Sequence, residues 1–453
     1  MKKQQGSQTV DIIGIGIGAF NLSLAALLTK TSLKYQFFDQ KKRFHWHRGM
    51  LLKNAQLQVH FLKDLASCVD PANPYTFLAY LVEKGRIYSF LNRKKNTVSR
   101  HEFNDYFQWA SQHIPDLYFD EKVLHVEYKN ALFHIVTTTQ QIQSKHLAIG
   151  TGISPYVPTI CEPFIGEPHF FHNYQSKQRI DSLDLVHKRI AVIGGGQSGA
   201  EIFDTLISQS TKPDNILWVS KRLNFQSLED SCFANELYTP NYVEYFYQLP
   251  EPIRQKKLEE QRLTSDGITQ DFSDAIYNKL YELKYIQKTP TIFDLAPNHT
   301  LTQVEKIDSH YLLTLHDHDN NQQTQYLVDV VILATGYQSL VPSCVNALLP
   351  GHENTDSLTI AQDYSIKWTY ADTNKIFIQN GAKHTHGVSD PNLSLAAWRN
   401  SIIINSLMKS VFYKTTMAEP LLTKKTCHSV IKGFFTSSLT IKAPHDESLF
   451  SLL

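Results

Sequence analysis

Two segments in which glycines follow a short apolar run constrain the fold of this chain more than any other feature. They span residues 12–39 and 189–220. In each, the apolar run predicts a buried strand, the glycines a tight turn, and the following residues a helix and a second strand. Such a unit is a parallel, right-handed crossover, so both segments predict Rossmann-like βαβ folds.

The first unit has the spacing of a dinucleotide-binding turn, with a strand at 12–15, a turn at 16–21, a helix at 22–29 and a strand at 35–39. Glycines let backbone N–H groups approach a pyrophosphate at a helix N-terminus, and an acid ending the second strand accepts hydrogen bonds from a ribose. Asn21 stands where a third glycine is usual and is expected to cap the helix. The residues expected to bind this nucleotide are Gly14, Gly16, Gly18, Asn21 and Asp39.

The second unit repeats this order, with a strand at 189–193, a turn at 194–199, a helix at 200–208 and a strand at 216–220. Its second strand ends in Ser220, Lys221 and Arg222 rather than in an acid. Cations at this place suit a 2′-phosphate and so predict NADPH rather than NADH, with Lys221 or Arg222 as the phosphate ligand. A solvated pair of cations is the alternative interpretation. The glycines of this turn are Gly194, Gly196 and Gly199.

Two nucleotide folds in one chain imply a flavin and a reductant of that flavin, because a simple dehydrogenase needs one such fold. The expected class is α/β, with two Rossmann-like domains for FAD and NADPH and a small helical substrate region, including a helical stretch at 251–285. A strand at 145–152 should close the first domain, and a strand at 328–335 should return the chain to it. The expected divisions are 1–165 for the first part of the FAD domain, 166–327 for the NADPH domain and 328–453 for the return.

Charge balance and residue types indicate which classes of partner this chain can bind. Lys and Arg total 44 against 43 for Asp and Glu, so the chain has no basic field for nucleic acid. The apolar run at 12–28 holds glycines and Asn21, which favours a buried unit over a membrane span, and the polar N-terminus carries no signal peptide. A cytoplasmic protein is expected. Its five cysteines, without a C-x-x-C pair, suit reduced thiols, and its twenty histidines show no metal-binding spacing, so no metal is expected.

The sequence resembles the N-hydroxylating flavin monooxygenases of siderophore biosynthesis over nearly its whole length and in family order. It is most similar to the lysine N6-hydroxylases and their relatives that act on putrescine or cadaverine. The segments that carry the resemblance are FFDQKKRFHWHRGML, LQVHFLKDLASCVDPANPYTFLAYL, TVSRHEFNDYFQWA, VIGGGQSGAEIF, TSDGIT, DVVILATGY and HTHGVSDPNLSLAAWR.

The resemblance implies roles for individual residues and no side-chain nucleophile. Beside the first turn, FAD would be contacted by Trp46, His47, Gln58 near its ring system, Leu393, Ser394 and Leu395. NADPH would be held by Gly194, Gly195, Gly196, Gln197, Ser198 and Gly199, with Lys221 or Arg222 at the phosphate and Thr264, Ser265 and Asp266 near the nicotinamide. The substrate would meet Lys63, Asn235, Glu236, Leu237 and Tyr238.

The implied reaction is FAD- and NADPH-dependent hydroxylation by O₂ of the terminal primary amine of L-lysine or a related diamine, for hydroxamate siderophores. The expected partners are this small amine and O₂, with a homo-oligomer left open. A flavin disulfide or quinone reductase is an alternative enzyme, although the chain lacks a C-x-x-C dithiol. A protein that binds FAD as a redox sensor without turnover is the alternative that is not an enzyme.

Overall fold

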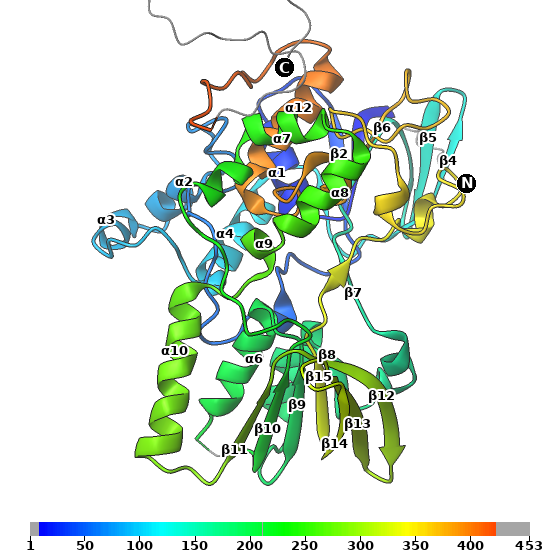
Figure 1. Cartoon of the computed structure of the whole chain (residues 1–453). Coiled ribbons are helices and arrows are strands. Elements are labelled where there is room, and N and C mark those ends of the chain that lie inside the picture. The colour runs from blue at the N-terminus through cyan, green and yellow to red at the C-terminus, as the bar shows by residue number, and fades with distance from the viewer. Residues whose placement is uncertain (1–8, 211, 423–453) are drawn as a thin grey trace, which may run out of the picture.

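The computed structural model describes residues 9–210 and 212–422. Cys427, expected to be a reduced thiol, and the expected end of the third segment lie outside the described residues. The chain forms two stacked parts, one built on a mixed sheet and the other on a parallel sheet, with the first sheet above the second in Figure 1 and β7 between them.

The first sheet has seven strands in the order β3-β2-β1-β6-β5-β4, with β17 also paired to β6. Strands β1, β2, β3, β6 and β17 pair in parallel, whereas β4, β5 and β6 form an antiparallel meander. The bounds are β1 Thr9–Ile15, β2 Tyr35–Phe38, β3 Leu117–Tyr118, β4 Val123–Lys129, β5 Leu132–Thr137, β6 Gln141–Ile149 and β17 Ile376–Ile378.

Helices cover this sheet with their apolar faces. Helix α4 is typical: Ser99 caps its N-terminus by accepting a hydrogen bond from the Glu102 N–H, and Phe103, Tyr106 and Phe107 are buried. The α-helices of this part are α1 Ala19–Leu28, α2 Phe77–Glu83, α3 Ile87–Leu91, α4 Arg100–His113, α11 Lys383–His386 and α12 Ala396–Met408. The short 3-10 turns are η1 Arg48–Met50, η6 Ser343–Val345, η7 Thr355–Ser357 and η8 Leu393–Leu395.

The second sheet is wholly parallel, in the order β11-β10-β9-β15-β8, and a three-stranded antiparallel sheet lies beside it. Its strands are β8 Phe170–His172, β9 Arg189–Ile193, β10 Asn215–Val219, β11 Ile292–Ala296 and β15 Val330–Leu333. The antiparallel strands are β12 His299–Ile307, β13 His310–Asp317 and β14 Gln322–Val328. The helical elements here are η2 Thr159–Phe164, η3 Asn173–Gln175, α5 Ser176–Ser182 and α6 Gln197–Ile207.

The expected return strand at 328–335 does not join the first sheet. Strand β15 pairs in parallel with β9 on one side and β8 on the other, and all four of its residues are buried. The prediction was wrong because an apolar strand followed by glycine suits either parallel sheet. The chain leaves the second sheet after Leu333, and β16 Tyr337–Gln338 then pairs antiparallel with β7 Ser154–Pro155, so the two connections lie side by side.

The stretch at 251–285 is helical, as predicted, but it is broken into several pieces. Together with η4 and α7 it forms the helical region between β10 and β11. The elements are η4 Ala234–Tyr238, α7 Pro240–Tyr247, α8 Glu251–Glu260, α9 Leu263–Asp266, α10 Gln270–Tyr281 and a π-helical turn, η5, at Glu282–Ile286.

The apolar run at 12–28 forms β1, the glycine turn and α1, as expected. Within the part of the chain that the structure describes, no helix combines the length and apolar character needed to cross a bilayer. Both crossover helices begin three residues earlier than predicted, at Ala19 and Gln197, so Asn21 and Gly199 lie inside the first helical turns. The helix N-caps are Gly18 and Gly196.

Candidate functional site

The first glycine turn is held by its close packing against the end of β6. Gly16 has φ +87, and a Cβ there would lie 2.5 Å from the Gly150 carbonyl oxygen. Asn21 is fully buried and donates from its amide to the Gly16 carbonyl at 2.8 Å. It does not cap the helix, so that expectation was wrong. Its larger side chain fits because residue 150 is also glycine, whose Cβ would otherwise lie 2.4 Å from the Asn21 amide.

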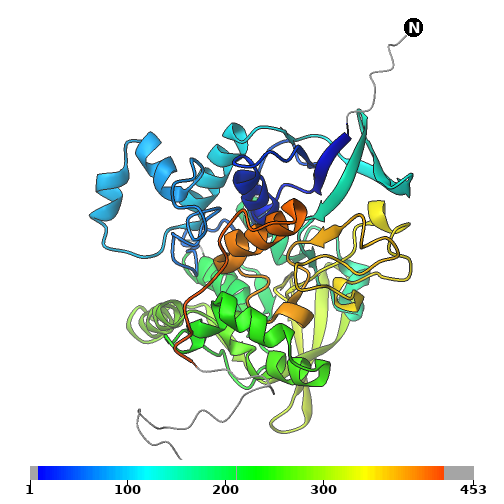
Figure 2. The same ribbon diagram turned by 90° about the horizontal axis from the view of Figure 1, so that it is seen from above.

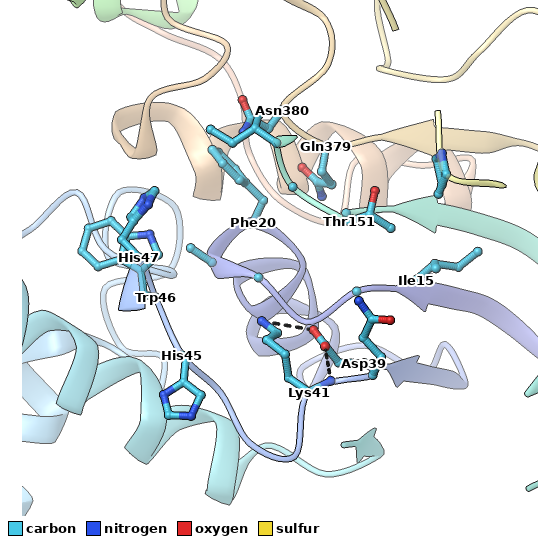
Figure 3. Close-up of a pocket in the computed structure, with 18 of the residues that line it drawn as sticks. Ile15, Phe20, Asp39, Lys41, His45, Trp46, His47, Thr151, Gln379 and Asn380 are labelled. Atoms are coloured by element: carbon cyan, nitrogen blue, oxygen red, sulfur yellow. Dashed lines mark hydrogen bonds and ion pairs between the residues drawn. The ribbon is translucent and has the colours of Figure 1, made fainter. Parts of the chain in front are cut away.

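Asp39 supports the same turn from the end of β2. Its buried carboxylate accepts a hydrogen bond from the Ile17 N–H at 2.7 Å and another from the Lys41 N–H at 2.8 Å. The Lys41 ammonium lies 3.2 Å from the same carboxylate, and Figure 3 shows both side chains at the floor of the pocket. Each carboxylate oxygen can accept more than one hydrogen bond, so Asp39 keeps the capacity to meet a ribose hydroxyl.

A cavity of about 900 Å³ opens above this turn, at the upper end of the size of small-molecule sites. Its walls come from the carboxyl ends of β1, β2 and β6 and from the loops that follow them, as expected where ligands bind parallel sheets. The lining includes Gly16, Gly18, Asp39, Trp46, His47 and Leu393 among the predicted residues.

The sequence reasoning missed several lining residues. Thr151 follows β6 and Gln379 follows β17, both at the edge where β1 and β2 end, so the alignment of parallel strand ends is the signal that could have found them. Figure 3 shows these two side chains across the pocket from Trp46 and His47. Others that line the cavity are Phe20, Gln40, Lys41, Met50, Tyr174, Tyr337 and Asn380.

One wall of the cavity is the segment from His45 to Met50. His47 adopts the left-handed conformation with φ 46, and a Cβ on Gly49 would lie 1.6 Å from the Tyr174 carbonyl oxygen. Enclosure by protein atoms, followed by the charge of Arg100, lowers the pKa of His47 to about 4, so its ring is neutral at pH 7 although it is accessible from the cavity. A strained, neutral histidine at a cavity wall is a feature of functional sites.

The second glycine turn is packed as tightly as the first but leaves its helix N-cap open. Gly194 has φ +138, and a Cβ there would lie 2.1 Å from the Ala334 carbonyl oxygen, while one on Gly199 would meet the Gly194 carbonyl at 2.0 Å. A Cβ on Gly196 would meet nothing nearer than the Asp266 carbonyl at 3.5 Å. A ligand can therefore approach the backbone at Gly196, at the N-terminus of α6.

The two cations after β10 differ in their surroundings. Lys221 is exposed, whereas Arg222 is half-buried and donates to the Asp266 carbonyl at 2.6 Å. Burial lowers the pKa of Arg222, and the Asp266 carboxylate opposes this effect. Arg222 thus holds the end of α9, which carries Thr264, Ser265 and Asp266, next to the turn. Lys221 is the more exposed of the two cations.

A chain of contacts joins the two turns. The Gln197 side-chain carbonyl accepts from the Thr269 N–H and its amide donates to Glu201, both at 3.0 Å. Glu201, buried on α6, forms an ion pair with Arg100 of α4, and the Arg100 guanidinium also donates to the carbonyl of Met50, at 3.3 Å. Met50 lines the cavity, so the second turn is mechanically linked to the wall of the first site.

The remaining predicted residues fall into two groups. Leu237 and Tyr238 are core residues that pack with Tyr242 and Phe246, and the Tyr238 hydroxyl donates to the Thr264 carbonyl at 2.6 Å. Asn235 is exposed and donates to Asp230 at 2.7 Å. The other group consists of exposed or half-buried residues outside the cavity lining: Gln58, Lys63, Ser198 and Glu236.

Three further predicted residues are fixed by local contacts. A Cβ on Gly195 would lie 2.1 Å from the Ser220 hydroxyl, so this glycine permits close approach of the turn to β10. In η8, Asn392 accepts hydrogen bonds from the backbone and hydroxyl of Ser394, and Leu395 is buried. Leu393 is the member of η8 that lines the cavity.

Two sheets, each with parallel strands that lead into a glycine turn at a helix N-terminus, define a protein with two dinucleotide-type sites, the class that couples a flavin to a nicotinamide. Residues 8–339 match the family described as L-lysine 6-monooxygenase/L-ornithine 5-monooxygenase, and the chain belongs to this family. The resemblance, the fold class and the monooxygenase class predicted from the motifs are thereby confirmed.

Individual relatives support this assignment. The chain is 37% identical over 421 residues to the L-lysine N6-monooxygenase of Escherichia coli, covering 92% of this chain and 98% of that protein. It is similar to the FAD-bound cadaverine monooxygenase DfoA of Erwinia amylovora, with TM-score 0.85, 29% identity and coverage of 92% and 99%. The Kutzneria ornithine N-hydroxylase KtzI, solved with reduced FAD, NADP⁺ and L-ornithine, has TM-score 0.81, 25% identity and coverage of 89% and 99%.

Proposed function

We propose that this protein uses FAD, NADPH and O₂ to hydroxylate the terminal primary amine of a small linear substrate. The observation that carries the proposal is the cavity of about 900 Å³, which extends from the first glycine turn to Tyr174 and Tyr337, next to the second part of the molecule. A cofactor that lies along this cavity would reach from the first glycine turn to Tyr174 and Tyr337, at the boundary between the two parts of the molecule.

The residues of the first turn fit FAD. A Cβ on Gly18 would meet nothing nearer than the Gly150 carbonyl at 3.7 Å, so the N-terminus of α1 is open to a pyrophosphate. Asp39 would hold the ribose, and Trp46 and His47 would wall the flavin. Bound FAD supplies the electron transfer and the activation of O₂, while the protein supplies orientation and electrostatics.

The second turn fits NADPH. The open backbone at Gly196 would receive the pyrophosphate, and the exposed Lys221 would meet the 2′-phosphate. Arg222 would act through the end of α9, because it already donates to the Asp266 carbonyl. The NADP⁺ in the KtzI structure supports a phosphorylated nicotinamide nucleotide as the reductant. Of the two cations, we propose Lys221 as the phosphate ligand, because it is exposed and Arg222 already donates to the Asp266 carbonyl.

Nitrogen attack requires a neutral amine, whose ammonium form has a pKa of about 10.4 in a lysine-like molecule. Burial is the first cause that lowers the pKa of His47 beside the cavity, and the same exclusion of water would lower the pKa of an amine bound there. We assign Arg100, which is paired with Glu201, a positioning role through its hydrogen bond to the carbonyl of Met50 in the cavity wall.

The substrate class we propose is a linear ω-amine, either L-lysine or a diamine such as cadaverine or putrescine. Relatives with lysine, cadaverine and ornithine in their names support a substrate with a short linear carbon chain and a terminal amine. Lys63 is the cation that would recognise an α-carboxylate. Burial, followed by the charge of Lys63, lowers the pKa of His60, so the Lys63 ammonium acts on its neighbours in this segment.

The test is a screen for hydroxylamine formation with lysine, ornithine, putrescine, cadaverine and histamine, in the presence of NADPH and O₂. We expect a product with one or more of the linear ω-amines. NADPH consumption with dithiols or quinones and without O₂ would instead indicate a reductase, and flavin binding without turnover would indicate a sensor.

Replacing Lys63 by Ala separates the two substrate types, with the exposed Lys53→Ala as the matched control. A charge-assisted contact to a carboxylate contributes about 1.5–3 kcal/mol, or roughly ten- to a hundredfold in kcat/KM. Loss of that size for lysine, with diamine turnover unchanged, would establish amino-acid recognition. Efficient turnover of cadaverine or putrescine by the unmutated protein, with no activity on lysine, would eliminate the carboxylate role of Lys63.

A further inference from the structure

Helices α1 and α12 are far apart in the chain but lie side by side in both views (Figures 1 and 2). The start of α12 carries Arg399, whose side chain is only 1% exposed although its guanidinium is always charged. The guanidinium lies 2.8 Å from the carboxylate of Asp390, which is equally buried, and it also donates to the Asp390 carbonyl. A charge is buried this completely only where it is paired, so the pair fixes the start of α12 to the preceding loop.

The Arg399 guanidinium is held between two aromatic rings. Its central carbon lies 4.8 Å from the centroid of the Phe20 ring and 5.0 Å from that of the Tyr364 ring, which are cation–π distances. Tyr364 is buried and adopts the left-handed backbone conformation, with φ 65, which a bulky residue keeps only where its surroundings impose it. Phe20 lines the cavity, so Arg399 is one side chain away from it.

Two buried hydrogen bonds connect this arrangement to Gln379, which follows β17 and also lines the cavity. The Arg399 guanidinium donates to the Gln379 side-chain oxygen at 3.4 Å, and the Gln379 amide nitrogen donates to the Asn400 side chain at 2.6 Å. Asn400, which is fully buried, donates in turn to the Phe20 carbonyl at 3.0 Å. The orientation of the Gln379 amide is therefore set by two neighbouring residues of α12.

The network joins three segments that line the first cavity. Phe20 lies two residues after Gly18, the N-cap of α1, Gln379 follows β17, and Pro391 follows the paired Asp390. Segments so far apart in the sequence keep their spacing only where other groups hold them together. A planar guanidinium that pairs, donates and stacks in different directions is suited to this task.

We propose that Arg399 is a positioning residue for FAD: it sets the spacing between the N-terminus of α1 and the Gln379 side of the cavity. This inference rests on the proposed FAD site at the first glycine turn. A purely structural role would need only the ion pair with Asp390, which a lysine ammonium can also form. The positioning role needs the planar set of donors as well, which an ammonium lacks, so the two roles predict different behaviour of Arg399→Lys.

The first test measures how fast FAD leaves the full-length holoenzyme on dilution, followed by flavin fluorescence, and compares this rate with the melting temperature. Arg399→Lys keeps a charge opposite Asp390 and should melt at a higher temperature than Arg399→Met, yet it should release FAD about tenfold faster than the unmutated protein. Arg189→Met breaks the pair with Asp329 in the second sheet and is the matched control for lost stability. It should release FAD at the unmutated rate.

The second test is a double-mutant cycle. Gln379→Met removes the amide that Arg399 orients and should also release FAD about tenfold faster, whereas its combination with Arg399→Lys should release FAD about tenfold and not about a hundredfold faster, because residues that act as a unit are not additive. Additive effects, or FAD release by Arg399→Lys at the unmutated rate, would overturn the positioning role. Gly18→Val reports on the proposed function separately: if that variant retained FAD, the FAD site itself would be wrongly placed.

Discussion

The two nucleotide turns share one backbone plan but differ in what surrounds them. In the first, Asp39 is buried and bonded to the turn itself, at 2.7 Å from the Ile17 nitrogen. In the second, Ser220 takes the place after the strand, and the exposed Lys221 follows. The first turn opens into a cavity lined by the ends of several strands, which suits a retained cofactor, whereas the second presents a cation to solvent, which suits a phosphorylated cofactor that binds and leaves.

The largest effect we expect comes from filling the open helix N-cap of either turn. Gly18→Val should prevent FAD retention, because its side chain would occupy the space that a pyrophosphate needs. Gly196→Val is its counterpart and should leave the protein yellow but unable to have its flavin reduced by NADPH. Flavin content and anaerobic reduction are the measurements. Identical behaviour of the two variants would mean that the sites are assigned in the wrong order.

A smaller effect should follow from breaking the link between the turns. Glu201→Gln removes the charge partner of Arg100. Removing one partner of a buried ion pair lowers the free energy of unfolding by about 3–5 kcal/mol. We expect the rate of flavin reduction to fall about a hundredfold, with a smaller change in the NADPH KM, because Arg100 would no longer fix Met50. Lys279→Met, which breaks the neighbouring pair with Asp204 on the same helix, is the control and should leave that rate nearly unchanged.

Replacing the two cations after β10 should have smaller effects, and the two replacements should differ in which nucleotide they affect. Lys221→Ala should raise the KM for NADPH about tenfold and leave NADH use unchanged, because it removes a contact to the 2′-phosphate alone. Arg222→Ala should impair the use of both nucleotides, because it releases the end of α9 at Asp266. Equal use of NADH and NADPH by the unmutated protein would refute the assignment of this turn.

The acid sensitivity of the first part should exceed that of the second. Burial lowers the pKa of His146 and His386, both in the first part, to about 4, as it does for His172 of β8. The unfolded state binds protons at these rings below about pH 6.5, so folding stability is full above that pH and is lost as the pH falls toward 4, by up to about 1.4 kcal/mol per pH unit for each ring. Thermal melting from pH 7 to pH 5 should show a shallower loss in His386→Gln than in the unmutated protein.

The predictions from sequence succeeded where a local pattern fixes the outcome. The glycine turns, the acid at Asp39 and the cations at 221 and 222 lie where expected because strand, turn and helix are contiguous in the chain. The pattern could not place β15, because its apolar residues suit either sheet, nor identify Gln379 and Thr151, because only the pairing of β17 and β1 with β6 brings them to one edge. Leu237 and Tyr238 resemble substrate contacts by motif, but they pack in the core.

Our central proposal is that NADPH at the second site reduces FAD at the first, and that O₂ then accepts the electrons, with one oxygen atom entering the amine and the other leaving as water. Its most direct test is to measure NADPH consumed, O₂ consumed and hydroxylamine formed in one reaction with lysine and in another with cadaverine. We predict that the three amounts agree for the preferred amine and that hydroxylamine formation disappears in both Gly18→Val and Gly196→Val. Consumption of NADPH and O₂ that yields hydrogen peroxide and no hydroxylated amine, with every amine tested, would contradict the account.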